Sequence, residues 1–239
     1  MLFDGDITFI NEEFRADLIS PDQLDTLLAQ GWRHFGTQFF RYSLGIYEFD
    51  IRRVIPLRIL LAGFSLSKSQ RRVKKQNSDL QTTIQPIEIT AEAIALFERH
   101  KQRFKFGVPD SIYDFLSDNP ASVPCEAFEL AVHLDGSLVA ISYFDVGERS
   151  VSAIYGMFEP KLSRRGLGIF TMLKEIEFAM EAGKEFYYQG YAYAGASFYD
   201  YKKRFRGTEV YDWNGNWRAF GSGEELTADD TDNADKKLI

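Results

Sequence analysis

The sequence contains a single cysteine, Cys125, and only three histidines. One cysteine excludes a disulfide within the chain and argues against a metal centre built from thiolates. No apolar run approaches the ~18 residues of a membrane-spanning helix, and the N-terminus lacks the basic and then apolar layout of a secretory signal. From these absences we expect a cytoplasmic protein with no membrane partner and no metal site.

No catalytic nucleophile stands out either. The sequence shows no Ser/His/Asp or Cys/His set, and His100 falls on the apolar face of an expected helix, where a structural histidine is the simpler interpretation. Asp145 is the one candidate acid–base group. It ends an expected strand among apolar residues, where an ionised carboxylate needs a partner. A turn before Gly147 is the alternative explanation for this aspartate.

Positive charge is in the minority, since 28 lysines and arginines face 35 acidic residues and give a net charge of −7. The basic residues nevertheless cluster in the ranges 68–75, 99–105, 164–165 and 202–206. Local basic patches on an acidic protein fit a phosphate-bearing partner held at a defined place, and solvated surface charge is the alternative. The segment 65–80 also concentrates hydroxyl and amide donors, which favours a bound phosphate or carboxylate.

Hydrophobic periodicity and turn residues predict a chain of mixed α and β structure. Ser20-Pro21 and Thr90 are typical helix starts, and Asp135-Gly136 between two alternating runs predicts a tight hairpin. A strand is also expected at 87–89. The range 150–213 then reads as strand, basic glycine turn, helix, strand, short basic helix and strand. Such a turn before a helix presents backbone N–H groups to an anion.

This order of elements resembles the acyl-CoA N-acyltransferase (GNAT) fold. The resemblance implies an α+β fold, a mixed sheet flanked by helices, with a smaller N-terminal subdomain. The loop Arg165–Phe170 has the arginine and glycines of that fold's acyl-CoA loop but departs from its pattern at the last position. We divide the chain into an N-terminal subdomain (1–85), a GNAT-like domain (86–218) and an acidic, disordered tail (219–239).

Six motifs, in the same order, resemble the aminoacyl-tRNA–protein transferases that act on protein N-termini, the arginyl-transferases and their bacterial leucyl-transferase relatives. The opening Gly31–Gly36 has the family's glycine–aromatic–arginine pattern, and the range 67–80 is close to its basic signature. The other motifs are Ser152–Tyr155 with Glu159-Pro160, the turn Arg165–Gly168, the segment Tyr188–Tyr191 and the segment Tyr201–Glu209. Together the motifs span about residues 31–217.

Two departures from the family pattern are visible. The clustered cysteines that usually follow the opening, and that are associated with a metal or iron–sulfur site, are absent from residues 37–58. We therefore expect neither an iron–sulfur nor a zinc site, and we expect aromatic packing around Tyr42 to take over the structural role. Gly207 stands where the family commonly has proline.

The resemblance implies transfer of leucine or arginine from aminoacyl-tRNA, the co-substrate, to the α-amino group of proteins with an N-terminal Asp or Glu, which tags them for degradation. The donor is an activated ester, and an acceptor amine with a pKa of about 8 is partly neutral at cellular pH. Direct aminolysis therefore needs no covalent enzyme intermediate, and positioning can supply most of the acceleration. Asp145 would be the base, and Tyr155 and Tyr191 would orient the ester.

Binding roles follow from the same resemblance and from side-chain chemistry. The residues expected to bind the acceptor carboxylate or tRNA are Arg58, Ser69, Gln70, Arg71, Arg72 and Asn77. Those expected to bind tRNA are Arg165, Gly166, Gly168, Tyr188, Tyr201 and Lys202. The tyrosines would stack on the terminal adenosine or lie in the core. Two alternatives are an acyl-CoA-dependent N-acyltransferase and a non-catalytic module that binds tRNA or protein N-termini.

Overall fold

A mixed sheet of nine strands forms the centre of the protein. The computed structural model describes residues 9–105 and 107–221. From one edge to the other, the strands are β12 (Trp217–Ala219), β11 (Thr208–Tyr211), β5 (Asp50–Leu60), β10 (Phe186–Tyr193), β9 (Ser150–Phe158), β8 (Ser137–Val146), β7 (Ala127–Leu134) and β6 (Gln81–Pro86), and β4 (Leu44–Tyr47) pairs with β5 outside this order. Only the β9–β10 pair is parallel among these described pairs.

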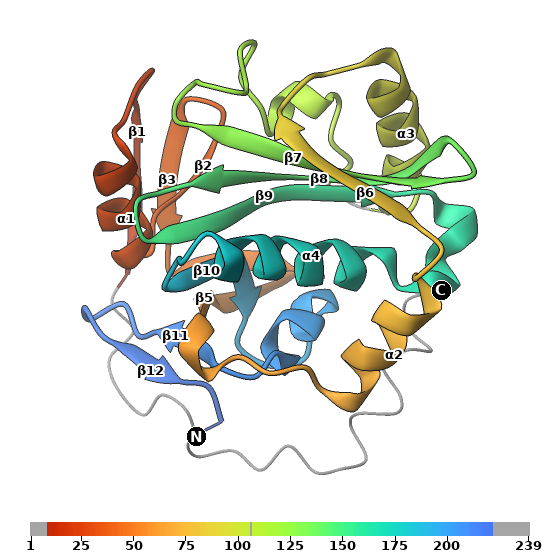
Figure 1. Cartoon of the computed structure of the whole chain (residues 1–239). Coiled ribbons are helices and arrows are strands. Elements are labelled where there is room, and N and C mark those ends of the chain that lie inside the picture. Colours follow the sequence, from red (N-terminus) through yellow and green to blue (C-terminus); the bar gives the residue numbers. More distant parts are fainter. Residues whose placement is uncertain (1–8, 106, 222–239) are drawn as a thin grey trace.

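Helices cover both faces of this sheet (Figure 1). The long helix α4 (Leu167–Glu181) buries Leu173 and Ile176 against one face, where they meet Tyr187 of β10. On the other face, α3 (Ala91–Lys101) and the short helix η2 (Ile112–Asp114) form a second core with β7 and β8. A mixed sheet between helices is the predicted GNAT-like α+β fold, which is thereby confirmed.

A small N-terminal module lies at the left of Figure 1. It consists of β1 (Asn11–Arg15), α1 (Pro21–Ala29), β2 (Arg33–Phe35) and β3 (Gln38–Tyr42), with its three strands in the order β1-β3-β2. Leu24 and Leu28 of α1 are at most 2% exposed and pack with Cys125 and Tyr188 of the large sheet. This packing places β2 beside the first residues of β9 and β10.

The remaining helices connect the strands of the sheet. They are η1 (Leu61–Gly63), α2 (Lys68–Gln76), η3 (Pro160–Arg165) and η4 (Phe198–Arg204). Helix α2 lies beside the start of α4, because the Asn77 side-chain amide donates hydrogen bonds to the carbonyl oxygens of Val73 and Arg165, at 2.9 and 2.8 Å. None of the helices within 9–105 and 107–221 has the length and apolar character needed to cross a membrane.

Most of the predicted element starts are found. Ser20 and Thr90 cap α1 and α3, and Asp135-Gly136 joins β7 and β8 with φ angles of +49° and +80°. The prediction of a strand at 87–89 is wrong. The strand in this part of the chain is β6, which ends at Pro86. Its residues are mostly exposed and polar at the edge of the sheet, so hydrophobic alternation did not mark them.

The large sheet draws strands from both sides of the boundary expected at residue 85. β5 precedes that boundary and β6 runs across it, yet β5 pairs with β10 and β11 while β6 pairs with β7. The three-stranded sheet of the N-terminal module ends at Tyr42. The division into domains stays a prediction. The expected disordered tail lies outside the described residues, apart from 219–221.

Candidate functional site

The strands β9 and β10 part in the middle of the sheet. Their parallel pairing covers only Phe186–Tyr188 against Ser150–Ser152. Each strand is also paired irregularly with its antiparallel neighbour. The pairing of β9 with β8 leaves out Ile154, and the pairing of β10 with β5 leaves out Gln189. Bulges of this kind bend a strand and increase its twist. We call the region beyond Ser152 and Tyr188 the fork.

Arg33 of β2 enters the fork from the N-terminal module. Its guanidinium donates to the Ser152 hydroxyl, with Nη1 at 2.8 Å from Oγ, and to the carbonyl oxygen of Ala153. Arg33 is 8% exposed, and burial lowers the pKa of its guanidinium while the charge of Asp145 opposes that change. Burying a cation costs free energy unless charges and hydrogen bonds compensate it. The contacts of Arg33 supply that compensation, so its position is specifically stabilised.

Lys202 of η4 reaches the same place from the other side. Its Nζ donates to the carbonyl oxygen of Tyr191 at 3.1 Å. Burial, and then the charge of Arg33, lowers the pKa of this amine to about 7. A Cβ atom on Gly190 would lie 3.4 Å from Lys202 Nζ and 3.8 Å from Arg33 Cζ. The two cations therefore flank one glycine, and in the described ranges Lys202 forms no ion pair with a carboxylate.

Tyr191 and Tyr155 lie on opposite strands of the fork. The Tyr191 hydroxyl donates to the carbonyl oxygen of Gly31 at 2.6 Å, which ties β10 to the N-terminal module. The Tyr155 ring stacks on Phe115 at 3.9 Å between centroids, and its buried hydroxyl has no hydrogen-bond partner among the described residues. Burial raises the pKa of both phenols, and the charge of Arg103 opposes this at Tyr155.

Asp145 lies behind Arg33, enclosed to 1% exposure. Its Oδ2 is 2.9 Å from His34 Nε2, and its Oδ1 accepts from Cys125 Sγ at 3.5 Å. His34, Cys125 and Asp145 each offer one ligand atom within 4.8 Å of the others, so they are the described residues that could hold a metal ion. The other ring nitrogen of His34 faces the carbonyl oxygen of Gly36 at 2.9 Å, which suits either a metal ligand or an imidazolium paired with Asp145.

Helix α2 displays a row of exposed cations. We call Lys68, Arg71, Arg72 and Lys75, which recur at helical spacing, together with the adjacent Arg164, the α2 face. The predicted residues Gln70 and Asn77 are buried and serve the helix ends instead. Gln70 closes a capping box with Ser67, and Asn77 ties α2 to the α4 turn. Ser69 is exposed, with its hydroxyl 3.0 Å from that of Ser67.

The basic turn before α4 adjoins this face. Gly166 adopts the left-handed conformation, with φ +65° and ψ +39°, and Gly168 lies in the first turn of α4. Arg165 makes a bidentate ion pair with Asp79, at 2.9 and 2.8 Å. The two basic segments 68–75 and 164–168, far apart in sequence, thus form one surface.

Arg58 lies apart from Arg71 and Arg72. Its Nε donates to Glu209 Oε2 at 2.6 Å, and its guanidinium lies over the rings of Phe186 and Trp217 at 4.0 and 4.3 Å. Tyr188 is buried beside it, with its hydroxyl 3.4 Å from Arg58 Nη1. Tyr201 packs at the edge of the α4-side core, and burial raises the pKa of its phenol.

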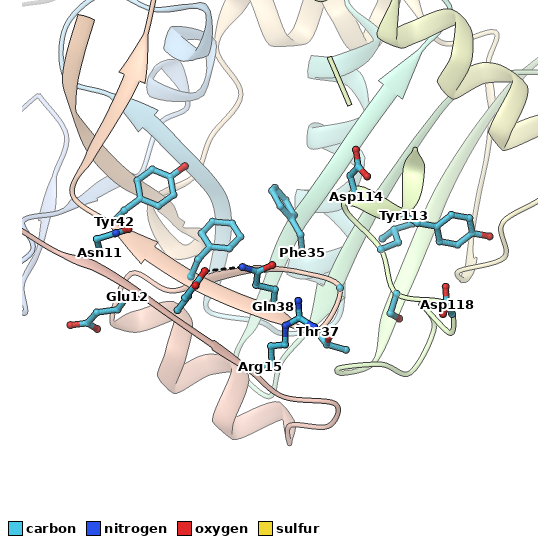
Figure 2. Close-up of a pocket in the computed structure, with 15 residues that line it drawn as sticks. Asn11, Glu12, Arg15, Phe35, Thr37, Gln38, Tyr42, Tyr113, Asp114 and Asp118 are labelled. Atoms are coloured by element: carbon cyan, nitrogen blue, oxygen red, sulfur yellow. Dashed lines mark hydrogen bonds between the residues drawn. The ribbon is translucent and has the colours of Figure 1, made fainter. Parts of the chain in front are cut away.

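A separate groove of about 740 Å³ lies between the N-terminal module and η2 (Figure 2). Its lining has four carboxylates against one arginine, namely Glu12, Glu13, Asp114, Asp118 and Arg15. Gln38 donates to Glu13 at 2.8 Å across its floor. Phe35 of β2 lines this groove while Arg33 of the same strand serves the fork. The groove is acidic, so it does not suit a phosphate.

Sequence reasoning missed Arg33 as a site residue. The available signal was its place in the opening motif Gly31–Gly36, but the motif alone does not show that β2 crosses to β9 and β10. From the sequence we expected Lys202 to bind tRNA. In the structure its amine is enclosed beside Gly190. Among the other candidates, Asp145 and Tyr191 lie around the fork, and Arg71, Arg72 and Arg165 lie on or beside the α2 face.

Comparison with known proteins bears on this arrangement. The family model described as arginine-tRNA-protein transferase, C terminus, matches residues 92–212. The aspartate/glutamate leucyltransferase of Pseudoalteromonas atlantica is 31% identical over 186 residues, which cover 76% of this chain and 77% of that protein. The enzyme of the same name from Xanthomonas campestris pv. campestris is 34% identical over 182 residues, 72% of each chain.

The crystal structure of FemX shares the fold. It superposes with a TM-score of 0.51 at 13% identity, and the match covers 84% of this chain and 69% of that one. The family match spans the hairpin, the fork, α4 and η4, where four of the six sequence motifs also lie. The relatives extend the similarity over most of the chain. The chain therefore belongs to the arginine-tRNA-protein transferase family.

Proposed function

We propose that this protein transfers leucine from leucyl-tRNA to the α-amino group of proteins that begin with Asp or Glu. The names of the relatives support the donor and the acceptors. The observation that carries the proposal is the fork, where Arg33 and Lys202 flank Gly190 at the point at which β9 and β10 part. Polarising groups enclosed away from water are what an acyl transfer without a nucleophilic enzyme residue requires.

The tRNA is expected on the α2 face. Its exposed cations lie beside the turn before α4, on the side of the sheet that α4 covers. Phosphate contacts give affinity without reading sequence, and on a chain with a net charge of −7 they need a local basic surface such as this one. The 3′ end of the tRNA would then pass from the α2 face to η4 and the fork.

The reaction is direct attack of the acceptor amine on the ester carbonyl carbon. Holding the two reactants together can supply much of the acceleration. Tyr191 fixes β10 to the N-terminal module, and Tyr155 of β9 stacks on Phe115. Asp145 is enclosed by His34 and Cys125 and lies behind Arg33, so we give it the role of orienting Arg33. Leucine added in this way would mark cytoplasmic proteins for degradation.

The test is transfer of radiolabelled leucine from leucyl-tRNA to peptides that begin with Asp, Glu or Ala. Arginyl-tRNA serves as the second donor, and acetyl-CoA is tested for thermal stabilisation of the protein. We expect label on the Asp and Glu peptides with leucyl-tRNA only. Label transferred only from arginyl-tRNA would show that arginine, not leucine, is the amino acid transferred. No transfer, together with stabilisation by acetyl-CoA, would overturn the proposal in favour of an acyl-CoA enzyme.

A further inference from the structure

We propose that Lys202 carries the proton during the transfer, and that Arg33 holds the oxyanion of the tetrahedral intermediate. The inference rests on the proposed function and assigns chemistry to its site. Both groups lie next to the same side of Gly190, since a Cβ atom on this glycine would be 3.4 Å from Lys202 Nζ and 3.8 Å from Arg33 Cζ. A carbonyl group placed beside Gly190 would therefore meet both side chains.

The surroundings of Lys202 differ from those of an ordinary lysine. Arg33 faces it from β2, and the carbonyl oxygen of Tyr191 faces it from β10. Within its own helix η4, its Nζ lies 5.2 Å from the ring centroid of Tyr199. The carboxylate of Asp145 is engaged by His34 and influences Arg33. Lys202 thus faces a second cation and neutral groups.

The neighbouring lysine gives the contrast. Lys203 pairs with Asp200 at 2.7 Å and donates to the carbonyl oxygen of Gly195 at 2.7 Å. Lys202 has a backbone carbonyl partner but forms no ion pair with a carboxylate of the described residues, and the pKa of its amine falls to about 7. Near neutral pH a large share of Lys202 is therefore a free amine, which can accept a proton and give it back.

The proposed step conserves atoms and charge. The acceptor enters as a neutral amine after losing its first proton to solvent, and its nitrogen forms a bond to the ester carbonyl carbon. The carbonyl oxygen becomes an oxyanion beside the Arg33 guanidinium. Neutral Lys202 takes one proton from the new ammonium nitrogen and gives it to the departing ribose oxygen as the C–O bond breaks. Lys202 ends neutral, and the products are an amide and a tRNA with a free hydroxyl.

This step predicts a distinctive pH dependence. Lys202 and the acceptor amine, whose pKa is about 8, must both be neutral. Below pH ~7 the logarithm of the single-turnover rate should therefore rise with a slope near two, and between pH ~7 and ~8 with a slope near one. A lysine with only a structural role would leave a slope of one at all these pH values.

Rapid-quench measurements from pH 5.5 to 8 test this with leucyl-tRNA and an N-terminal Asp peptide. Lys202→Met and Lys202→Arg should each lower the rate at pH 7 by ~100-fold or more and reduce the low-pH slope to one. Arg keeps the charge but does not release a proton. The control Lys203→Met should keep the slope of two. A slope of two in Lys202→Arg, or a slope of one in the wild type, would overturn the proposal.

A second measurement does not depend on activity. The Nζ and Cε signals of isotopically labelled lysine are followed by NMR against pH, and the Lys202 signal is identified by its absence from Lys202→Arg. We expect this Lys202 signal to titrate near pH 7. A Lys202 signal that titrates above pH 9 would refute the proton-transfer role even if leucine transfer is confirmed. A titration near 7 without leucine transfer would instead reject the proposed function.

Discussion

Glu175 shows how one buried side chain can set the pH dependence of the whole protein. It is 1% exposed within the α4 core, and the Tyr187 hydroxyl donates to its Oε2 at 2.6 Å. Burial raises the pKa of this carboxyl from 4.5 to about 7, and the nearby hydroxyls of Ser142 and Tyr187 limit the rise. The folded protein therefore holds a proton there over a range in which the unfolded chain has lost it.

We expect Glu175 to make the protein less stable as the pH rises from about 4.5 to about 7. In that range the folded state binds more protons than the unfolded state, so the free energy of unfolding falls with pH. The loss is at most ~3 kcal/mol, at about 1.4 kcal/mol for each pH unit of pKa displacement. Chemical denaturation at pH 5 and at pH 7.5 measures it.

Glu175→Gln is the matched variant for this prediction. Its amide oxygen can still accept from Tyr187, but it has no proton to lose. The difference in stability between pH 5 and pH 7.5 should shrink by ~1–3 kcal/mol relative to the wild type. An unchanged difference would mean that Glu175 is not the group that binds the proton.

At the scale of elements, the turns required particular residues that the sequence only partly revealed. The family commonly has proline where this chain has Gly207, and Gly207 adopts φ +78°, which proline does not reach. A Cβ atom there would lie 2.8 Å from the carbonyl oxygen of Leu60 and 3.0 Å from the carbonyl carbon of Gly63. The turn between η4 and β11 is thus packed directly on η1.

Gly207→Ala is expected to destabilise the protein by more than ~2 kcal/mol, since it combines backbone strain with a clash. Gly183→Ala is the control, because Gly183 has a similar φ of +67° but nothing within 4 Å of an added Cβ. That change should cost only ~1 kcal/mol. Thermal or denaturant unfolding of both variants measures the difference, and equal losses would show that the close contact with Leu60 is not present.

Elements with strong local signals were predictable. The Ser20 cap, the Asp135-Gly136 hairpin and the stop of α4 before Gly183 depend on nearby residues alone. The edge strand β6 was not, because its exposed polar residues lack a hydrophobic period. The fork was also out of reach. It depends on two bulges and on β2 crossing to β9, where Arg33 meets a residue 119 positions away in the sequence.

At the scale of the whole molecule, basic and acidic side chains gather on different surfaces. The α2 face is basic, while the charged residues that line the groove of Figure 2 are mainly carboxylates. The basic segments could be found from sequence as clusters, and the structure joins two of them. Sequence could not tell which members are exposed. Gln70 and Asn77 hold the helix, whereas Arg72 and Lys75 face solvent.

Arg72→Ala is expected to weaken tRNA binding and to reduce the slope of log affinity against log salt by about one, the value for one lost phosphate contact. Arg149→Ala is the control. Arg149 is also exposed, but it precedes β9, at the end of the strand away from the α2 face, and pairs with Glu185 at 2.6 Å. Filter binding at several salt concentrations measures both. Equal salt slopes for the two variants would place the tRNA elsewhere.

The central claim is that the transfer occurs at the fork. The most direct measurement is a crystal structure of the protein with a leucyl-adenosine analogue in which an amide replaces the labile ester. The account predicts the analogue's carbonyl group beside Gly190, with its oxygen in hydrogen-bonding distance of the Arg33 guanidinium and Lys202 Nζ next to the carbonyl carbon. An analogue bound in the acidic groove between the N-terminal module and η2, or anywhere away from Gly190, would contradict it.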